Sequence, residues 1–229
     1  MKKAIKIQLQ LTLFSLLAII LLTTCTKGKG NIYAEGRVYN PITGEGHSGI
    51  EMKLIRTNAI NGDLFEGSNR KHEQTVITDE NGNFVIEHIG NLFGTYILQP
   101  RDPSGTYVNV TWDQYKSALD GERPIKPKEE LYDNFQMVGL GVTNFYLKNV
   151  NCVNEFDSLH YERTYLLTNK NYANNFYWTG CLNSDGNYTG SGEGDYKVDW
   201  YVIRNGVRTD SSTFFTVHEG QTTNVDIFY

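Results

Sequence analysis

The sequence predicts an all-β protein made of two small antiparallel β-sandwich domains that follow an N-terminal leader. Fifteen tyrosines and many threonines and valines tilt the composition toward β-structure. After the leader, short runs that alternate apolar and polar residues recur between turn residues, as half-buried strands do. No segment beyond the leader shows a long helical period, apart from one short candidate described below.

The leader, residues 1–24, has the pattern of a secretory signal. Three lysines stand within its first six positions, and Leu11 to Leu22 is a run of apolar and small hydroxyl residues. The run has about 12 residues, whereas a bilayer-spanning helix needs about 20. We therefore expect the leader to be removed rather than retained as an anchor.

Cys25 closes the leader in the sequence Leu22-Thr23-Thr24-Cys25, which resembles the lipobox of bacterial lipoproteins, although Thr24 stands where that family usually has Gly or Ala. The resemblance implies cleavage before Cys25, acylation of its thiol, for example with palmitate, and a protein held in the membrane by lipid. Plain secretory cleavage is the alternative. Residues 26–30 are basic, whereas surface-exported lipoproteins of Bacteroidota carry acidic residues there. We therefore expect the periplasmic face of the outer membrane rather than the cell surface.

Cys152 and Cys181 remain as an even pair once Cys25 is assigned to the anchor. In an exported protein such a pair predicts a disulfide. It would close a loop of about 30 residues. Two free thiols or a metal pair are the alternatives, but there is no C-x-x-C motif and no nearby histidine to support a metal site.

The charge balance bears on partners. The net charge is −5 at pH 7, and removal of the leader lysines makes the chain more acidic still. An acidic chain without a basic stripe is a poor partner for nucleic acid. About 200 residues follow the leader, enough for one large or two small domains.

After a tether at residues 25–31, a first domain is expected at residues 32–141. Asp79-Glu80-Asn81-Gly82 predicts a hairpin turn, since Asn-Gly takes positive φ at low cost, and residues 58–70 predict a polar loop. The expected strands are Ile32–Tyr39, Gly49–Ile55, Gln74–Thr78, Asn83–Glu87, Gly94–Leu98 and Tyr107–Thr111.

Four of these stretches resemble the carboxypeptidase-regulatory-like, or transthyretin-like, β-sandwich family. They are Gly36-Arg37-Val38-Tyr39, Gly49 to Leu54, Thr78 to Phe84, and Gly94-Thr95-Tyr96. The resemblance covers about 70 residues and implies a β-sandwich that packs and carries no catalytic residues.

Residues 113–134 form the most polar interval of the chain. Trp112, Tyr115 and Leu119 fall at helical spacing, so one short helix is expected near 112–119. Pro124 and Pro127 would end it. We expect a surface excursion from the first domain.

Residues 142–229 predict a second small sandwich, similar to immunoglobulin-like lipoprotein modules. Asn205-Gly206 is a strong hairpin signal, and Val198, Trp200 and Val202 are expected to share one buried face. A single larger sandwich that uses all strands is the alternative. The expected strands are Val142–Val150, Leu159–Leu167, Tyr196–Arg204, Val207–Val217 and Thr222–Phe228.

No motif predicts catalysis or a cofactor. The five histidines are scattered without metal-ligand spacing, and Asp79-x-Asn81 fits a turn better than a calcium loop. Motifs for a serine hydrolase, a zinc protease or a phosphate-binding loop are absent. A Ser/His/Asp triad whose members meet only in the folded chain remains an alternative, but no residue points to one.

Residues 169–194 mix rings with many Asn, Gly and Ser residues, a composition that suits a sugar-binding surface. Tyr172, Tyr177 and Trp178 are the candidate ligand residues. The alternative is that Phe176 and Trp178 pack into a core. Alternation along a strand places Tyr177 opposite both, so Tyr177 is expected to be exposed.

Together these features predict a non-enzymatic binding or assembly protein of the cell envelope, held by a lipid anchor, with an envelope protein as partner. A glycan-binding accessory protein that uses residues 172–188 is the main alternative, and a hydrolase is the third.

Overall fold

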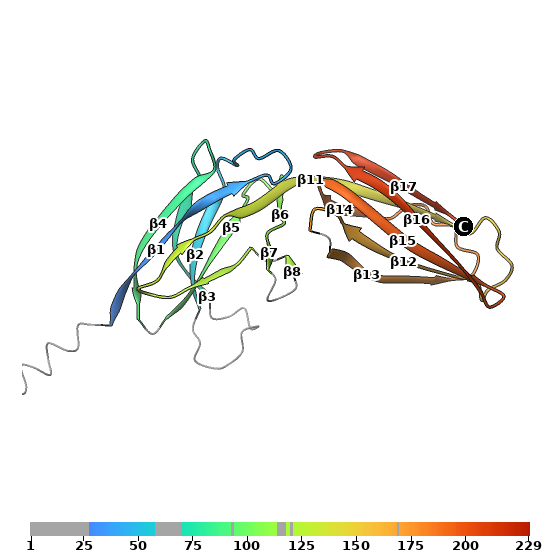
Figure 1. The fold of residues 1–229 in the computed structure, drawn as a ribbon, viewed down its shortest axis with the longest axis horizontal. Coiled ribbons are helices and arrows are strands. Elements are labelled where there is room, and N and C mark those ends of the chain that lie inside the picture. Colours follow the sequence, from blue (N-terminus) through green and yellow to red (C-terminus); the bar gives the residue numbers. More distant parts are fainter. Residues whose placement is uncertain (1–27, 58–69, 93, 114–117, 120, 169) are drawn as a thin grey trace, which may run out of the picture.

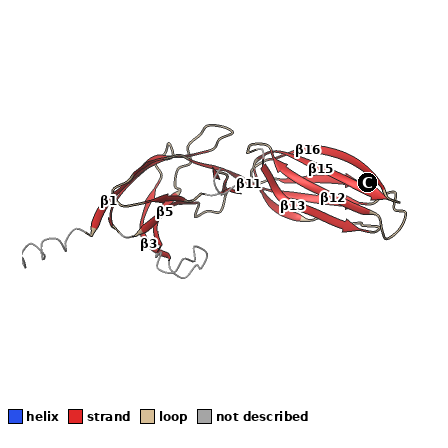
Figure 2. Cartoon of the chain, turned by 60° about the horizontal axis from the view of Figure 1, so that its bottom comes forward, coloured by secondary structure: helices blue, strands red, loops and turns tan. Residues whose placement is uncertain are grey.

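In the computed structural model the chain forms two elongated lobes that lie end to end (Figure 1), and the turned view in Figure 2 keeps the same arrangement. No helix occurs among the described residues. The structure describes residues 28–229 except 58–69, 93, 114–117, 120 and 169, and only the backbone at 112–113, 118–119 and 170–175.

The strands in chain order are β1 (Lys29–Tyr39), β2 (Glu51–Thr57), β3 (Arg70–Ile77), β4 (Asn83–Asn91), β5 (Thr95–Arg101), β6 (Tyr107–Asn109), β7 (Trp112–Asp113), β8 (Ala118–Leu119), β9 (Arg123–Ile125), β10 (Glu130–Tyr132), β11 (Phe135–Lys148), β12 (Ser158–Tyr165), β13 (Lys170–Thr179), β14 (Tyr188–Gly192), β15 (Gly194–Arg204), β16 (Val207–Val217) and β17 (Thr222–Phe228).

The first lobe, residues 28–139, packs one sheet of β4, β1, β10, β6 and the start of β11 against a second sheet in the order β3-β2-β5-β9. Alternate residues of each strand point between the sheets. Met52, Leu54, Ile86 and Leu98 are fully buried there. Each such side chain contributes roughly 1.5–3 kcal/mol through burial. The core of this lobe is mostly aliphatic, with Phe84, Tyr96 and Phe135 as its buried rings.

The second lobe, residues 140–229, packs the rest of β11 with β14 and β17 against a sheet in the order β13-β12-β15-β16. Its core is rich in rings. Tyr161 stacks on Phe145 at 5.6 Å between centroids, and Tyr165 stacks on Tyr196 at 4.7 Å. Val198 is fully buried among them, as the sequence predicts.

β11 runs through both lobes and is paired along its whole length. Its first residues pair with β1 and β6, and its remaining residues pair with β14 and β17. The expected domain boundary after residue 141 falls inside this strand. Gly141 is required there, since a Cβ would lie 2.5 Å from the carbonyl oxygen of His218 in the turn that crosses the strand.

The predicted all-β class is confirmed, but the sheets are not purely antiparallel. β1 pairs in parallel with β10 and β11, and β11 pairs in parallel with β17. Each of these pairs joins strands far apart in the chain, which long connections allow and tight hairpins do not. Hairpin signals in the sequence therefore could not reveal them.

Where the structure describes residues 112–119, it shows two short strands instead of the expected helix. Trp112–Asp113 pairs antiparallel with Ala118–Leu119, and Tyr115 lies outside the described residues. The preceding backbone is already extended along β11, because the amide of Val110 donates to Gln136 O at 2.8 Å. That sheet pairing outweighs the helical spacing of three apolar residues.

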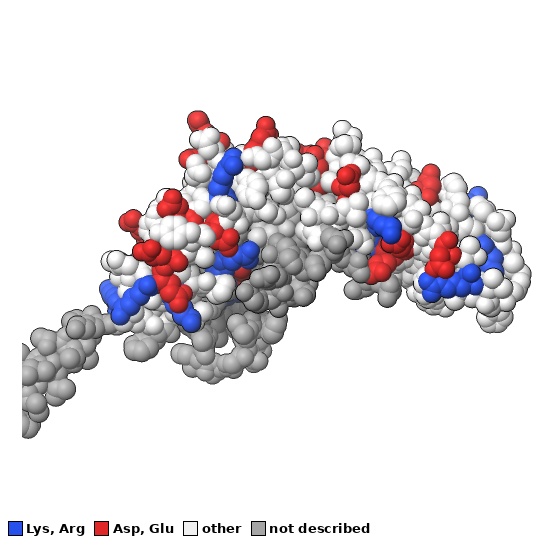
Figure 3. Space-filling model, viewed as in Figure 1, with Lys and Arg blue, Asp and Glu red and all other residues white. Residues whose placement is uncertain are grey.

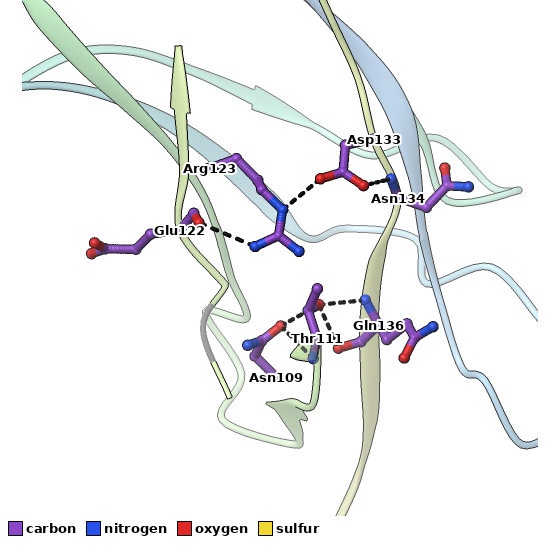
Figure 4. A network of polar contacts seen from close by, with 7 residues as sticks. All are labelled: Asn109, Thr111, Glu122, Arg123, Asp133, Asn134 and Gln136. Atoms are coloured by element: carbon purple, nitrogen blue, oxygen red, sulfur yellow. Dashed lines mark hydrogen bonds and ion pairs between the residues drawn. The ribbon is translucent and has the colours of Figure 1, made fainter. Parts of the chain in front are cut away.

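Two groups of polar contacts lie within the excursion of residues 113–134 and next to it (Figure 4). The Arg123 guanidinium pairs with the Asp133 carboxylate, and the other carboxylate oxygen accepts from the amide of Asn134 at 2.8 Å. Beside it, the Thr111 hydroxyl accepts from the amide of Gln136 at 2.7 Å. The excursion is joined to the first lobe by strand pairing, since β9 pairs with β5 and β10 pairs with β1.

Candidate functional site

The outer face of the β13-β12-β15-β16 sheet carries one row of planar side chains that crosses all four strands. We call it the aromatic row, and its members are Tyr177 on β13, His160 on β12, Tyr201 on β15 and Arg208 on β16. The sheet register sets His160 directly opposite Tyr177 on one side and Tyr201 on the other. The row forms because each residue sits at an outward position of its own strand.

The members of the aromatic row contact one another, with His160 stacked on Tyr201 and tilted by 48° against Tyr177. The His160 ring lies 4.5 Å from the Tyr177 ring and 4.4 Å from the Tyr201 ring, with planes only 12° apart in the second pair. The Arg208 guanidinium lies 3.7 Å over Tyr201. Neighbouring strands are about 4.8 Å apart, close to these ring separations. The rings therefore stack from one strand to the next, with the planes of His160 and Tyr201 upright on the sheet.

The two ends of the aromatic row differ. On β16, Arg208 forms an ion pair with the exposed carboxylate of Asp210. On β13, Tyr177 is 58% exposed, and His160 is its ring partner. The β16 end is thus covered by a charged pair, whereas the β13 end presents one open ring face.

The position of His160 affects its protonation. Partial burial between the two tyrosine rings lowers its pKa below 6.5, and the nearby positive charge of Arg208 lowers it further. Both causes favour the neutral imidazole over the charged one.

The sequence-predicted ligand residues do not form one surface. Trp178 lies on the inner face of β13, where it stacks with Tyr161 at 5.3 Å, and Phe176 joins the same cluster. Trp178 therefore packs toward the core, as the alternative interpretation held. Tyr177 is exposed on the opposite face, and the side chain of Tyr172 lies outside what the structure describes.

A disulfide and a buried carboxylate hold the end of β13. Cys152 and Cys181 are bonded with their Cα atoms 5.3 Å apart. Asp157 is buried next to this bridge, where it accepts from the amide of Val153 at 3.0 Å and lies 3.4 Å from the Arg204 guanidinium. These bonds to the Asp157 carboxylate lower its pKa, the Val153 amide most of all. The open end of the aromatic row thus lies on an anchored strand.

A second surface lies on the outer face of β1, β4 and β10 in the first lobe, where Figure 3 shows Asp and Glu side chains crowded together. Tyr33 donates to Glu35 at 2.6 Å, and this bond is the main cause that raises the pKa of Tyr33 to about 12. Tyr132 is 66% exposed and borders a shallow hollow between β1 and β10. The surface is acidic.

Sequence reasoning missed three members of the aromatic row. In the sequence His160 is one of five scattered histidines. Tyr201 and Arg208 lie on strands that were predicted from the residues of their buried faces. Alternation along β15 does place Tyr201 opposite Trp200 and Val202, so its outward position was available. Its alignment with His160 depends on strand order and register, which residues alone do not give.

Cys25, the expected lipidation site, lies outside the described residues. Among residues 28–229 as described, no three His, Cys, Asp or Glu side chains group as metal ligands. The same part of the chain contains no helix that is long and apolar enough to cross a bilayer.

Comparisons with known proteins give distant likenesses. No family model matches the chain, and no curated protein matches it. The resemblance of residues 36–96 to the carboxypeptidase-regulatory-like family therefore stays a prediction.

Solved structures that resemble this chain include three from Gram-positive bacteria. The Bacillus anthracis TIE protein has 12% identity and a TM-score of 0.35, over 87% of this chain and 34% of that one. The shaft pilin SpaA of Lactobacillus rhamnosus GG has 10% identity and a TM-score of 0.32, over 87% and 97%. The minor pilin GBS52 of Streptococcus agalactiae has 11% identity and a TM-score of 0.34, over 87% and 94%. This chain thus spans about a third of the TIE protein, and values this low do not indicate a shared function.

Proposed function

We propose that this chain is a lipid-anchored protein of the cell envelope that acts as a non-enzymatic binding or assembly module. Acylated Cys25 holds it to the periplasmic face of the outer membrane. The first lobe lies next to the membrane, and the second lobe offers its outer sheet face to a protein partner. The Cys152–Cys181 disulfide supports export, because such bonds persist in oxidising compartments.

The end-to-end arrangement of the lobes carries this proposal. β1 begins at the end of the first lobe that is farthest from the second lobe (Figure 1). Cys25 precedes Lys29 by four positions, a reach of at most about 14 Å. The aromatic row crosses the opposite end of the molecule, near the β15–β16 hairpin. An anchor at Cys25 would therefore leave that end free to meet a partner.

The geometry of the rings favours a protein partner over a glycan. A sugar stacks on an exposed ring face, but both faces of His160 and of Tyr201 are covered by their neighbours in the row. Tyr177 alone in the row offers an open face. A single open ring face at a sheet edge is better suited to contact with an extended peptide chain than to the stacking of a sugar.

Fractionation of cells that express the full chain tests the anchor. The Cys25→Ala variant should move from the membrane fraction to the soluble fraction, because it lacks the thiol that carries the proposed lipid anchor. The Cys152→Ser/Cys181→Ser variant is the matched control and should stay with the membrane. Membrane retention of Cys25→Ala would overturn the anchor, and removal of the protein by protease added to intact cells would overturn the periplasmic location.

A further inference from the structure

The outer edge of β13 is open at its end next to the disulfide. β13 lies at the end of the strand order β13-β12-β15-β16, and within the described residues no strand pairs with its other side. Tyr177 and Thr179 are both exposed on this stretch. An edge of this kind can accept a further strand through its backbone groups.

The hydrogen-bond pattern shows which backbone groups point outward. The amide of Gly180 donates to Asp157 O at 2.7 Å, on the side toward β12. Successive residues of a strand direct their N–H and C=O groups to opposite sides. Thr179 and Tyr177 lie one and three positions before Gly180, so they turn their N–H and C=O groups away from β12 and toward the open edge.

The opposite edge of the same sheet is protected. At the corresponding position on β16, the exposed Arg208–Asp210 ion pair lies along the edge. Charged side chains on an edge strand discourage pairing with another chain. On β13 that position holds the open face of Tyr177 instead. The β13 edge therefore permits pairing with another strand, whereas the β16 edge discourages it.

We propose that the outer edge of β13 pairs with an extended segment of a partner protein, and that this segment places an arginine opposite Tyr177. The inference rests on the proposed function and names the surface and the chemistry of the partner. The partner strand exchanges backbone hydrogen bonds with Tyr177 and Thr179, and its arginine lies on the open ring face.

An arginine fits because it would repeat at the open end of the row what Arg208 does at the closed end. The row would then read Arg, Tyr177, His160, Tyr201, Arg208, with a guanidinium over each tyrosine. A cation over a tyrosine face is attracted by the ring quadrupole, and the net charge of −5 on this chain favours a basic segment. The same edge of a second copy does not meet this requirement, since β13 contains no arginine.

The test uses the purified full chain in detergent micelles and a synthetic probe peptide of alternating threonine and valine with one central arginine. Hydrogen exchange should slow at residues 176–180 when the probe is added and should not slow along β16. Thr179→Pro removes one outward N–H and leaves the bonds to β12 intact, so it should weaken probe binding at least tenfold. Ser212→Pro makes the matched change on the β16 edge and should change the affinity less than twofold.

Tyr177→Ala keeps the test decisive if Thr179→Pro fails to fold. This variant should bind the probe about two- to fivefold more weakly, the value of an exposed cation–π contact. Replacing the arginine of the probe by serine should cost the same factor in the wild-type chain and nothing in Tyr177→Ala. Equal binding by Thr179→Pro, exchange protection along β16, or protection of β13 by a second copy in the absence of the probe would each overturn the proposal. Because the probe assay does not depend on the anchor, it can fail while the Cys25→Ala test succeeds.

Discussion

The two lobes share a β-sandwich plan but are stabilised in different ways. The first lobe buries aliphatic side chains such as Met52 and Leu54. The second lobe buries stacked rings around Arg163, whose guanidinium lies 5.6 Å from the Tyr196 ring and donates to the Thr143 hydroxyl at 3.2 Å. Apolar burial has no direction, whereas rings and polar bonds fix geometry. The lobe with the more directional core is the one that carries the aromatic row.

The surfaces of the lobes differ as well. The first lobe shows an acidic sheet face, while the second lobe shows a row of rings that ends at an open strand edge. In the proposed arrangement the acidic face belongs to the anchored lobe. The open edge belongs to the distal lobe, where the disulfide and Asp157 hold the end of β13.

Loss of the disulfide should produce the largest difference in stability between the two lobes. The Cys152→Ser/Cys181→Ser variant should lose about 3–4 kcal/mol of stability in the second lobe, because the bridge closes a loop of about 30 residues. Hydrogen exchange followed by mass spectrometry should show faster global opening of residues 140–229 and unchanged protection of β2 and β5. Equal loss in both lobes would show that they unfold as one unit.

The converse change is Leu54→Ala in the first lobe. Leu54 is fully buried, so its truncation leaves a cavity and should cost about 3 kcal/mol. Exchange should accelerate in β2, β3 and β5 and stay unchanged at the end of β13. Val85→Ala, a half-exposed position on β4, is the control and should have little effect.

Acid should weaken the second lobe through Asp157. The folded-state pKa of this carboxyl lies below its unfolded value of about 3.9. Its contribution is therefore present above that value and is lost as pH falls through the folded pKa. Urea unfolding between pH 7 and pH 2, followed by exchange at β12 and β13, should show this loss. Asp157→Asn should flatten the pH dependence, and an unchanged profile would exclude Asp157 as the cause.

The smallest expected effect is that of Tyr201→Ala. Removing the ring between His160 and Arg208 should cost about 0.5–1 kcal/mol, the value of cross-strand ring contacts. It should also raise the pKa of His160, because the imidazole loses part of its shielding from water. Phe214→Ala is the control on the same sheet, since Phe214 is 65% exposed. NMR titration of His160 and thermal unfolding measure both effects.

Much of this fold follows from local patterns. Alternation predicts most strands of the second lobe and the exposure of Tyr177, and the even cysteine pair predicts the disulfide. Register and strand order do not follow, because they depend on contacts between distant segments. For the same reason the sequence missed the partners of Tyr177 in the aromatic row, the parallel pairing of β11 with β17, and the β7–β8 pair in place of a helix.

Photo-crosslinking in living cells is the most direct test of whether the partner binds the second lobe at the edge of β13 and not the first lobe. A benzophenone side chain is placed at Thr179 on the open edge, at Ser212 on the charged edge, or at Tyr132 on the first lobe, with Cys25 intact. We expect a discrete protein adduct from position 179, joined through an extended segment that contains an arginine, and none from positions 212 and 132. Adducts from position 212 or 132 without one from position 179 would contradict it.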